Sequence, residues 1–205
     1  MKGGDDLRQE IICMQLIYKM KEIIKRAGVN AFIKPYEIIV LSENSGILEF
    51  VSNSISVDAM KKDREGTTIG EFFSQVFETE SKLIQAKENF IRSLVGSSII
   101  TYVLKLKDRH NGNILLDNEG HIIHIDFGFI LGMSPGGLNF ESSPFKLTEE
   151  YVEFMGGKNS ADYQFFAELF CEGMRALREK YEELCLVLEI MMENSDLECF
   201  KDFKI

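Results

Sequence analysis

A polar loop and the Asp-Phe-Gly sequence after it hold the residues best suited to chemistry. Asp108 and Asn113 lie five residues apart in the loop, and Asp126 begins Asp-Phe-Gly. In phosphoryl-transfer enzymes a catalytic-loop Asp orients the attacking hydroxyl, and an Asn five residues later and the Asp of D-F-G bind Mg²⁺ on the ATP phosphates. The spacing predicts this chemistry, with Gly128 freeing the backbone after the metal ligand. A surface hairpin rich in Asn, Asp and Gly is the alternative interpretation.

All three histidines of the chain, His110, His121 and His124, lie in the same region. A zinc site is disfavoured because no cysteine lies nearby, and because His121 and His124, three apart on a predicted strand, would point to opposite faces. We expect these two to be structural. His110 and Asp108 are both candidates for the base that accepts the substrate proton, and the sequence leaves this choice open.

Hydrophobic periodicity predicts the elements that position these loops. Helical spacing and turn residues predict a small sheet followed by a mainly helical body, and therefore an α+β fold. The expected elements are a helix over 6–27, a hairpin with strands in 33–41 and 47–51, a helix from Thr68, a longer one toward Lys105, strands over 114–116 and 121–125, an irregular segment after 128, and a helical region capped by Thr148.

Composition excludes several classes of function. The 205 residues contain 23 Lys plus Arg against 33 Asp plus Glu, and the net charge of −10 disfavours non-specific binding to nucleic acid. No apolar run is long enough to span a bilayer, and the start of the chain does not resemble a signal peptide. The four cysteines form no C-x-x-C pair, so neither a disulfide framework nor a zinc site is indicated.

The order Asp108-Arg109-His110 differs from the His-Arg-Asp of protein kinases and resembles the phosphoinositide 3-/4-kinase superfamily, whose loops read D-R-H-x-x-N and D-F-G. The residue before Asp108 is Lys107, whereas 3-kinases and related large protein kinases have Gly at this position. In this respect the loop resembles that of the phosphatidylinositol 4-kinase family. Similar stretches are 4–10, 107–113, 120–129, 145–148 and 155–157, and the hairpin 33–49 resembles the type III beta branch.

This resemblance implies a protein-kinase-like bilobal fold, represented mostly by its helical C-lobe. Residues 1–51 would be a remnant of the N-lobe and the hinge, and residues 52–205 the C-lobe. The catalytic loop would occupy 107–113 and the activation loop 126–147. On this basis we expect the chain to be truncated at both ends relative to a complete kinase domain.

The resemblance also implies roles for individual residues. Lys2 would pair with ATP phosphates, although a frayed terminal Lys is the simpler interpretation from sequence alone, and Glu10 would orient it. The remaining adenine and ATP contacts would come from Tyr36, Leu48, Glu49, Val51 and Ile125. The catalytic residues would be Asp108, Arg109 and His110, the metal ligands Asn113 and Asp126, and the substrate-facing activation-loop residues Phe129, Pro144 and Lys146.

The activation loop indicates the substrate class. No Lys or Arg lies between Asp126 and Lys146, whereas head groups with added phosphates need cations. The resemblance then implies transfer of the ATP γ-phosphate to the 4-hydroxyl of phosphatidylinositol, with Mg²⁺, or alternatively Mn²⁺, as cofactor. We expect a cytoplasmic protein, peripheral on Golgi-like membranes. The alternatives are a phosphatidylinositol 3-kinase, a related serine/threonine protein kinase, or a fragment that is inactive on its own.

Overall fold

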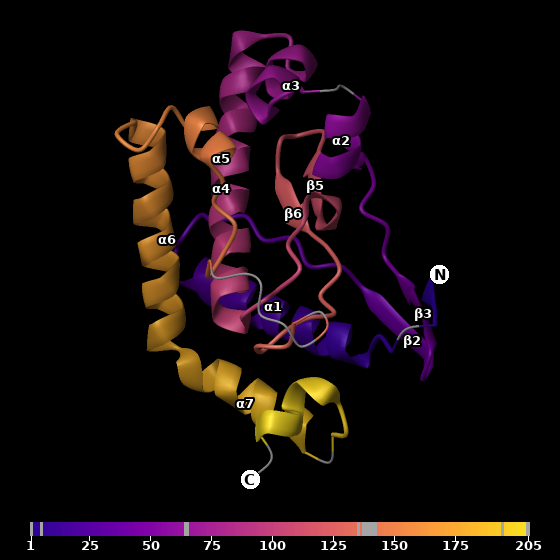
Figure 1. The fold of residues 1–205 in the computed structure, drawn as a ribbon. Coiled ribbons are helices and arrows are strands. Elements are labelled where there is room, and N and C mark those ends of the chain that lie inside the picture. Colours follow the sequence, from indigo (N-terminus) through magenta and orange to yellow (C-terminus); the bar gives the residue numbers. More distant parts are fainter. Residues whose placement is uncertain are drawn as a thin grey trace.

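The computed structural model describes residues 2–4, 6–63, 66–134, 136, 143–193 and 195–203. Helices and short strands alternate in its first two thirds, and helices fill the rest (Figure 1). The elements are β1 (Lys2–Gly3), α1 (Arg8–Arg26), β2 (Ile38–Ser42), β3 (Ser45–Leu48), β4 (Ser54–Ser56), α2 (Val57–Asp63), α3 (Ile69–Val76), α4 (Glu80–Leu104), the 3₁₀ turn η1 (Asn111–Asn113), β5 (Ile114–Asp117), β6 (Ile122–His124), α5 (Glu149–Phe154), α6 (Ala161–Glu179), α7 (Tyr181–Met192) and the 3₁₀ segment η3 (Glu198–Phe203).

Two small antiparallel sheets carry the loops of interest. One has the strand order β1-β3-β2, with Ile39 opposite Ile47. The other has the order β4-β5-β6, with Leu115 opposite Ile123. In the second sheet, β5 follows the predicted catalytic loop directly and β6 leads into Asp-Phe-Gly, so the hairpin brings the two loops to the same end.

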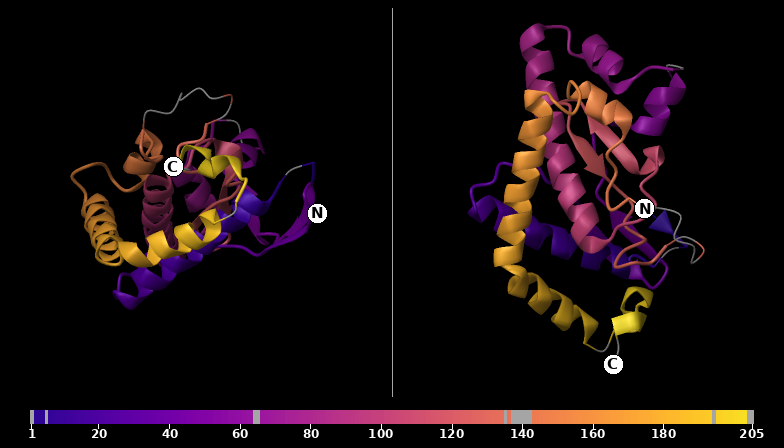
Figure 2. Two further views of the ribbon diagram at one scale, coloured as in Figure 1. Left: turned by 90° about the horizontal axis from the view of Figure 1, so that it is seen from below. Right: turned by 60° about the vertical axis from the view of Figure 1, so that its left-hand side comes forward.

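The helix α4 forms the centre of the hydrophobic core. It packs against α6 on one side and β6 on the other, and α1 crosses near its C-terminal end (Figure 1). From Phe90 to Leu104 most of its residues are buried, which explains why its sequence is apolar on more than one face. The gold helix α7 lies along α1, as Figure 2 shows. None of the described helices is long and apolar enough to cross a membrane.

Most of the predicted elements are confirmed, with shifted boundaries. The helix expected over 6–27 is α1, the helix expected from Thr68 is α3, with Thr68 as its N-cap, and Thr148 is a capping residue as predicted. The first hairpin strand starts later than expected, at Ile38, because Pro35 lacks an amide for the ladder. The helical region after Thr148 is divided into α5, α6 and α7. Gly156 and Gly157, with φ angles of 94° and 89°, separate α5 from α6, and the non-helical backbone of Lys180 separates α6 from α7. The short elements β4 and α2 were not predicted from the sequence.

Close backbone contact requires a glycine in the middle of α4. A Cβ atom on Gly96 would lie 2.1 Å from the carbonyl oxygen of Phe32 and 2.8 Å from Ile33 Cγ1. The Phe32 ring in turn stacks on His121, with centroids 3.8 Å apart. The segment between α1 and β2 therefore lies against both α4 and the beginning of β6.

Replacing this glycine should loosen that contact. We expect Gly96→Ala to lower the free energy of unfolding by about 1–3 kcal/mol, because the added methyl group forces backbone apart. Urea denaturation followed by circular dichroism would measure the change. Gly70→Ala in α3 is the matched control, since its Cβ would be at ordinary contact distance, 3.4 Å from Phe154 Cδ2. Equal stability of the two variants would contradict this account.

Candidate active site

Two acidic residues of the predicted site have left-handed backbone conformations. The φ angle is 63° at Asp108 and 60° at Asp126. Residues other than glycine rarely adopt this region, and such strain is concentrated at functional sites. The expectation that Gly128 supplies the backbone freedom is wrong, because the left-handed residue is Asp126 itself and Gly128 does not have a positive φ.

Hydrogen bonds within the catalytic loop fix its shape. The left-handed residue Lys105 ends α4, and the amide of Lys107 donates to the carbonyl of Phe129 at 3.0 Å. Asn113 donates through Nδ2 to the backbone carbonyl of Asp108 at 3.0 Å. Because that bond occupies the amide nitrogen, the Asn113 side chain keeps its oxygen as the atom for a metal ligand.

The Arg109 side chain lies behind the loops. It is 5% exposed, and its guanidinium donates to the carbonyl oxygens of Lys107 at 3.0 Å, Ile125 at 2.8 Å and Asp126. It also lies over the Phe127 ring. Burial lowers the pKa of the guanidinium, an effect that the nearby Asp126 and Asp108 oppose. Sequence reasoning grouped Arg109 with the catalytic residues, whereas its contacts are those of a positioning residue that joins the two loops.

The structure brings the two candidate bases together. His110 Nε2 lies 3.9 Å from Asp108 Oδ1, and the His110 side chain is largely exposed. The Gly112 amide donates to His110 Nδ1 at 3.0 Å. In a neutral imidazole whose Nδ1 accepts a hydrogen bond, Nε2 carries the proton. In this tautomer the Nε2–H of His110 would face the carboxylate of Asp108.

The two predicted metal ligands are linked through the backbone. The amide of Ile125 donates to the carbonyl of Asn113 at 3.0 Å, which fixes Asp126 relative to Asn113. A carboxylate and an amide oxygen suit Mg²⁺, which takes few protein ligands and completes its octahedron with phosphates and water. Within the described residues no group of three or more His, Cys, Asp or Glu side chains could hold a metal ion by itself.

Burial lowers the pKa of His124 to about 3, so this imidazole is neutral.

A cavity of about 350 Å³ opens beside these loops. Its volume is in the range of ligand and cofactor sites. Six residues predicted to contact ATP line it, together with Asp126; they are Glu10, Tyr36, Leu48, Glu49, Val51 and Ile125. Phe50, which the family resemblance places in the hinge with Leu48, Glu49 and Val51, lines it as well. Sequence reasoning did not assign two further lining residues, Ser54 and Leu115, of which Leu115 had a signal as a residue of the predicted strand beside the catalytic loop.

The remaining predicted residues are not among those that line the cavity. Lys2 pairs with Gly46 in the first sheet, and its side chain is outside the described part of the structure. Phe129 is half-buried and Pro144 is exposed. Lys146 donates through Nζ to the carbonyl of Arg109 at 3.0 Å and to Asn111 Oδ1 at 2.8 Å, so this activation-loop cation contacts the catalytic loop. Residues 137–142 of the activation loop lie outside the described part.

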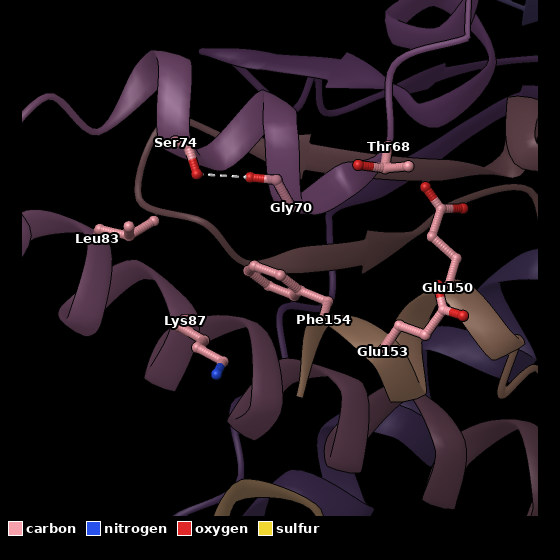
Figure 3. A pocket seen from close by; sticks show the side chains of 8 residues that line it. All are labelled: Thr68, Gly70, Ser74, Leu83, Lys87, Glu150, Glu153 and Phe154. Carbon is pink, nitrogen blue, oxygen red and sulfur yellow. Dashed lines mark hydrogen bonds between the residues drawn. The ribbon is translucent and has the colours of Figure 1, made fainter. Parts of the chain in front are cut away.

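A second cavity, of about 400 Å³, lies between α3, α4 and α5 and contains none of the predicted site residues (Figure 3). Among its charged side chains, Lys87 binds Asp162 at 2.6 Å and Glu150 binds Lys61 at 2.7 Å. Ser74 Oγ donates to the carbonyl of Gly70. The side chains of Lys87, Glu150 and Ser74 therefore make structural contacts.

The α+β frame, the D-R-H-x-x-N and D-F-G loops and the cavity beside them have the arrangement of a protein-kinase-like phosphotransferase. Comparison with known proteins gives the family. Residues 1–199 match the family model described as "Phosphatidylinositol 3- and 4-kinase". The chain belongs to this family.

Relatives that are similar over almost the whole chain carry more specific names. A phosphatidylinositol 4-kinase of Dictyostelium discoideum is 45% identical over 203 residues, which are 98% of this chain and 17% of the relative. Phosphatidylinositol 4-kinase beta of Danio rerio is 44% identical over 203 residues, which are 98% of this chain and 24% of the relative. The Rattus norvegicus protein of the same name is 43% identical over 202 residues, which are 98% of this chain and 25% of the relative. The chain thus spans a quarter or less of the length of these relatives.

The position of Arg109 leads to a stability prediction. In Arg109→Lys the charge is kept, but a single ammonium cannot bridge three separate carbonyl groups. We expect the free energy of unfolding to fall by about 1–3 kcal/mol, because buried carbonyl groups lose their donors. Chemical denaturation of the purified chain would measure it. Arg175→Lys, at an exposed position on α6, is the control and should change little; a similar small change in Arg109→Lys would refute the bridging role.

Proposed function

We propose that this chain is the catalytic core of an ATP-dependent phosphatidylinositol 4-kinase, which transfers the γ-phosphate of ATP to the 4-hydroxyl of phosphatidylinositol. The observation that carries the proposal is the position of Asp126. It lines the cavity with six predicted ATP contacts, and its loop is hydrogen-bonded to the loop of Asp108 and Asn113. The names of the relatives support the lipid substrate and the 4-position.

ATP would enter the cavity with its adenine between apolar side chains of Leu48, Val51 and Ile125. Its phosphates would then extend toward Asp126 and Asn113, which would hold Mg²⁺, or Mn²⁺ as the alternative. When bound, the metal ion supplies positive charge that stabilises the transferring phosphoryl group. Lys2 would add a further cation on the phosphate side.

Asp108 would act as the base and His110 as a hydrogen-bond donor. The hydroxyl of the inositol ring would give its proton to the Asp108 carboxylate as it attacks the γ-phosphorus, while the bond from that phosphorus to the β,γ-bridging oxygen breaks and ADP leaves. The Nε2–H of His110, beside Asp108, would donate to an oxygen of the phosphoryl group or of the carboxylate. The bond from the Gly112 amide to Nδ1 keeps the imidazole in this donor form.

The activation loop favours a head group without added phosphates. No Lys or Arg occurs between Asp126 and Lys146, and the Lys146 ammonium contacts Arg109 and Asn111 of the catalytic loop. A second or third phosphate on the inositol ring would therefore lack the cations that such groups require.

The same family resemblance supports a division of the chain and a place of action. We assign residues 1–51 to the N-lobe and hinge and residues 52–205 to the C-lobe of the kinase. The protein would act in the cytoplasm as a peripheral protein on membranes that contain phosphatidylinositol, Golgi-like by family resemblance.

Loss of a metal ligand should abolish transfer. We expect Asp126→Asn to lower γ-phosphate transfer from ATP to phosphatidylinositol vesicles by at least ~10²-fold, because the neutral amide binds the metal ion poorly. Thermal unfolding should be nearly unchanged, since the Asp126 side chain is exposed. Radiolabelled ATP would give the rate. Asp58→Asn on the surface of α2 is the control; transfer by Asp126→Asn at the control's rate would be inconsistent with the assigned role.

Substrate and product identity test the rest of the proposal. We expect turnover of phosphatidylinositol and none of its 3,5-bisphosphate, whose 4-hydroxyl is free, because the activation loop lacks cations for the extra phosphates. Chromatography of the deacylated product should give the 4-phosphate. Phosphorylation of the bisphosphate would rule out the substrate class, and a 3-phosphate product would support the 3-kinase alternative.

A further inference from the structure

Two buried side chains far apart in the sequence hold the backbone of Asp-Phe-Gly. The amide of Asp126 donates to the Tyr36 hydroxyl oxygen at 3.3 Å, and the amide of Phe127 donates to Glu10 Oε1 at 3.4 Å. The Tyr36 hydroxyl in turn donates to the same carboxylate oxygen. Glu10 and Tyr36 are each 3% exposed. A continuous chain of hydrogen bonds thus connects α1, the segment before β2 and the segment after β6.

The sequence suggested that Glu10 orients Lys2, whose side chain lies outside the described part of the structure. Among the described residues, the Glu10 carboxylate accepts from a hydroxyl and a backbone amide. Burial, followed by the nearby Glu10 carboxylate, raises the pKa of Tyr36, so the phenol stays protonated and can donate to Glu10 while it accepts from Asp126.

The neighbouring residue on α1 holds the other end of the motif. Gln9 donates through Nε2 to the carbonyl of Gly128. On the opposite side, the Arg109 guanidinium donates to the carbonyl groups of Ile125 and Asp126. The amides and the carbonyls of this short segment are therefore held by different side chains, and both groups of contacts are needed to determine its conformation.

We propose that Glu10 and Tyr36 are positioning residues that hold Asp126 in its left-handed conformation, so that its carboxylate lies in the cavity where the metal ion and the ATP phosphates bind. A left-handed non-glycine residue costs about 1 kcal/mol or more and persists only where surrounding contacts determine it. The two amide hydrogen bonds are such contacts. The inferred effect on metal binding and catalysis rests on the proposed function. The inference that Glu10 and Tyr36 hold the backbone of Asp126 does not.

Amide hydrogen exchange on the 205-residue chain tests the holding directly. In Tyr36→Phe the Asp126 amide loses its acceptor, so we expect it to exchange at least about tenfold faster. Tyr18→Phe is the matched control. It removes a hydroxyl that donates to Glu37 at 2.6 Å on the exposed side of α1, and it should leave the exchange of Asp126 and Phe127 unchanged. Unchanged exchange in Tyr36→Phe would overturn the proposal.

Conservative replacement of Glu10 separates positioning from general stability. Glu10→Gln keeps an oxygen that can accept from the Phe127 amide, whereas Glu10→Ala removes it. We expect exchange of this amide to increase in the order wild type, Glu10→Gln, Glu10→Ala, at matched circular dichroism spectra. Equal exchange in Glu10→Ala and wild type would show that the carboxylate does not hold the motif.

Metal binding and kinetics test the consequence. We expect Tyr36→Phe to weaken binding of Mn²⁺ in the presence of ATP about tenfold by electron paramagnetic resonance, and to raise the half-saturating Mg²⁺ concentration similarly, with the KM for phosphatidylinositol unchanged. Faster amide exchange with unchanged metal affinity would overturn the catalytic consequence. Absence of any lipid phosphorylation by the wild-type chain would instead count against the proposed function, and the exchange and Mn²⁺ results would still decide this inference.

Discussion

The candidate site depends on the left-handed conformation of two aspartates, Asp108 and Asp126. Each would be strained in isolation, because the side chain crowds the backbone in this region. Asn113 holds the first by donating to its carbonyl group, and Arg109 donates to the carbonyl of the second. Since Arg109 belongs to the catalytic loop and its acceptors include the Asp-Phe-Gly segment, neither loop could move far without disrupting the other.

This mutual dependence explains the arrangement of the larger elements. The catalytic loop follows the C-terminal end of α4, and the β5–β6 hairpin brings the Asp-Phe-Gly segment back beside that loop. The helix α1 approaches from the other side with Gln9 and Glu10 in its first turn. Gly96 allows the segment that leads to Tyr36 to lie directly on α4. The site is thus fixed by elements that are separated in sequence and meet in the core.

Sequence reasoning could predict the parts of this arrangement that are local. The periodicity of α1 and α4, the helix start at Thr68, the cap at Thr148 and the D-R-H-x-x-N and D-F-G spacings are properties of short windows. The contact between Glu10 and Phe127 joins residues 117 positions apart, and no local pattern encodes it. The short strand β4 was missed for a related reason, since three residues carry little periodic signal and the strand exists because it pairs with β5.

These contacts explain how a chain with a net negative charge is compatible with phosphoryl transfer. Two cations of the described loops, Arg109 and Lys146, direct hydrogen bonds to backbone carbonyls of the catalytic and Asp-Phe-Gly loops. Their charge therefore stabilises the loops, and the triphosphate of ATP would rely on metal ions at Asn113 and Asp126 for most of its neutralisation. A site of this kind needs no basic surface, so a net charge of −10 is compatible with phosphoryl transfer. In the proposed reaction the rate would also depend on the placement of Asp126, because that carboxylate would have to attract the metal ion without repelling the phosphates beside it.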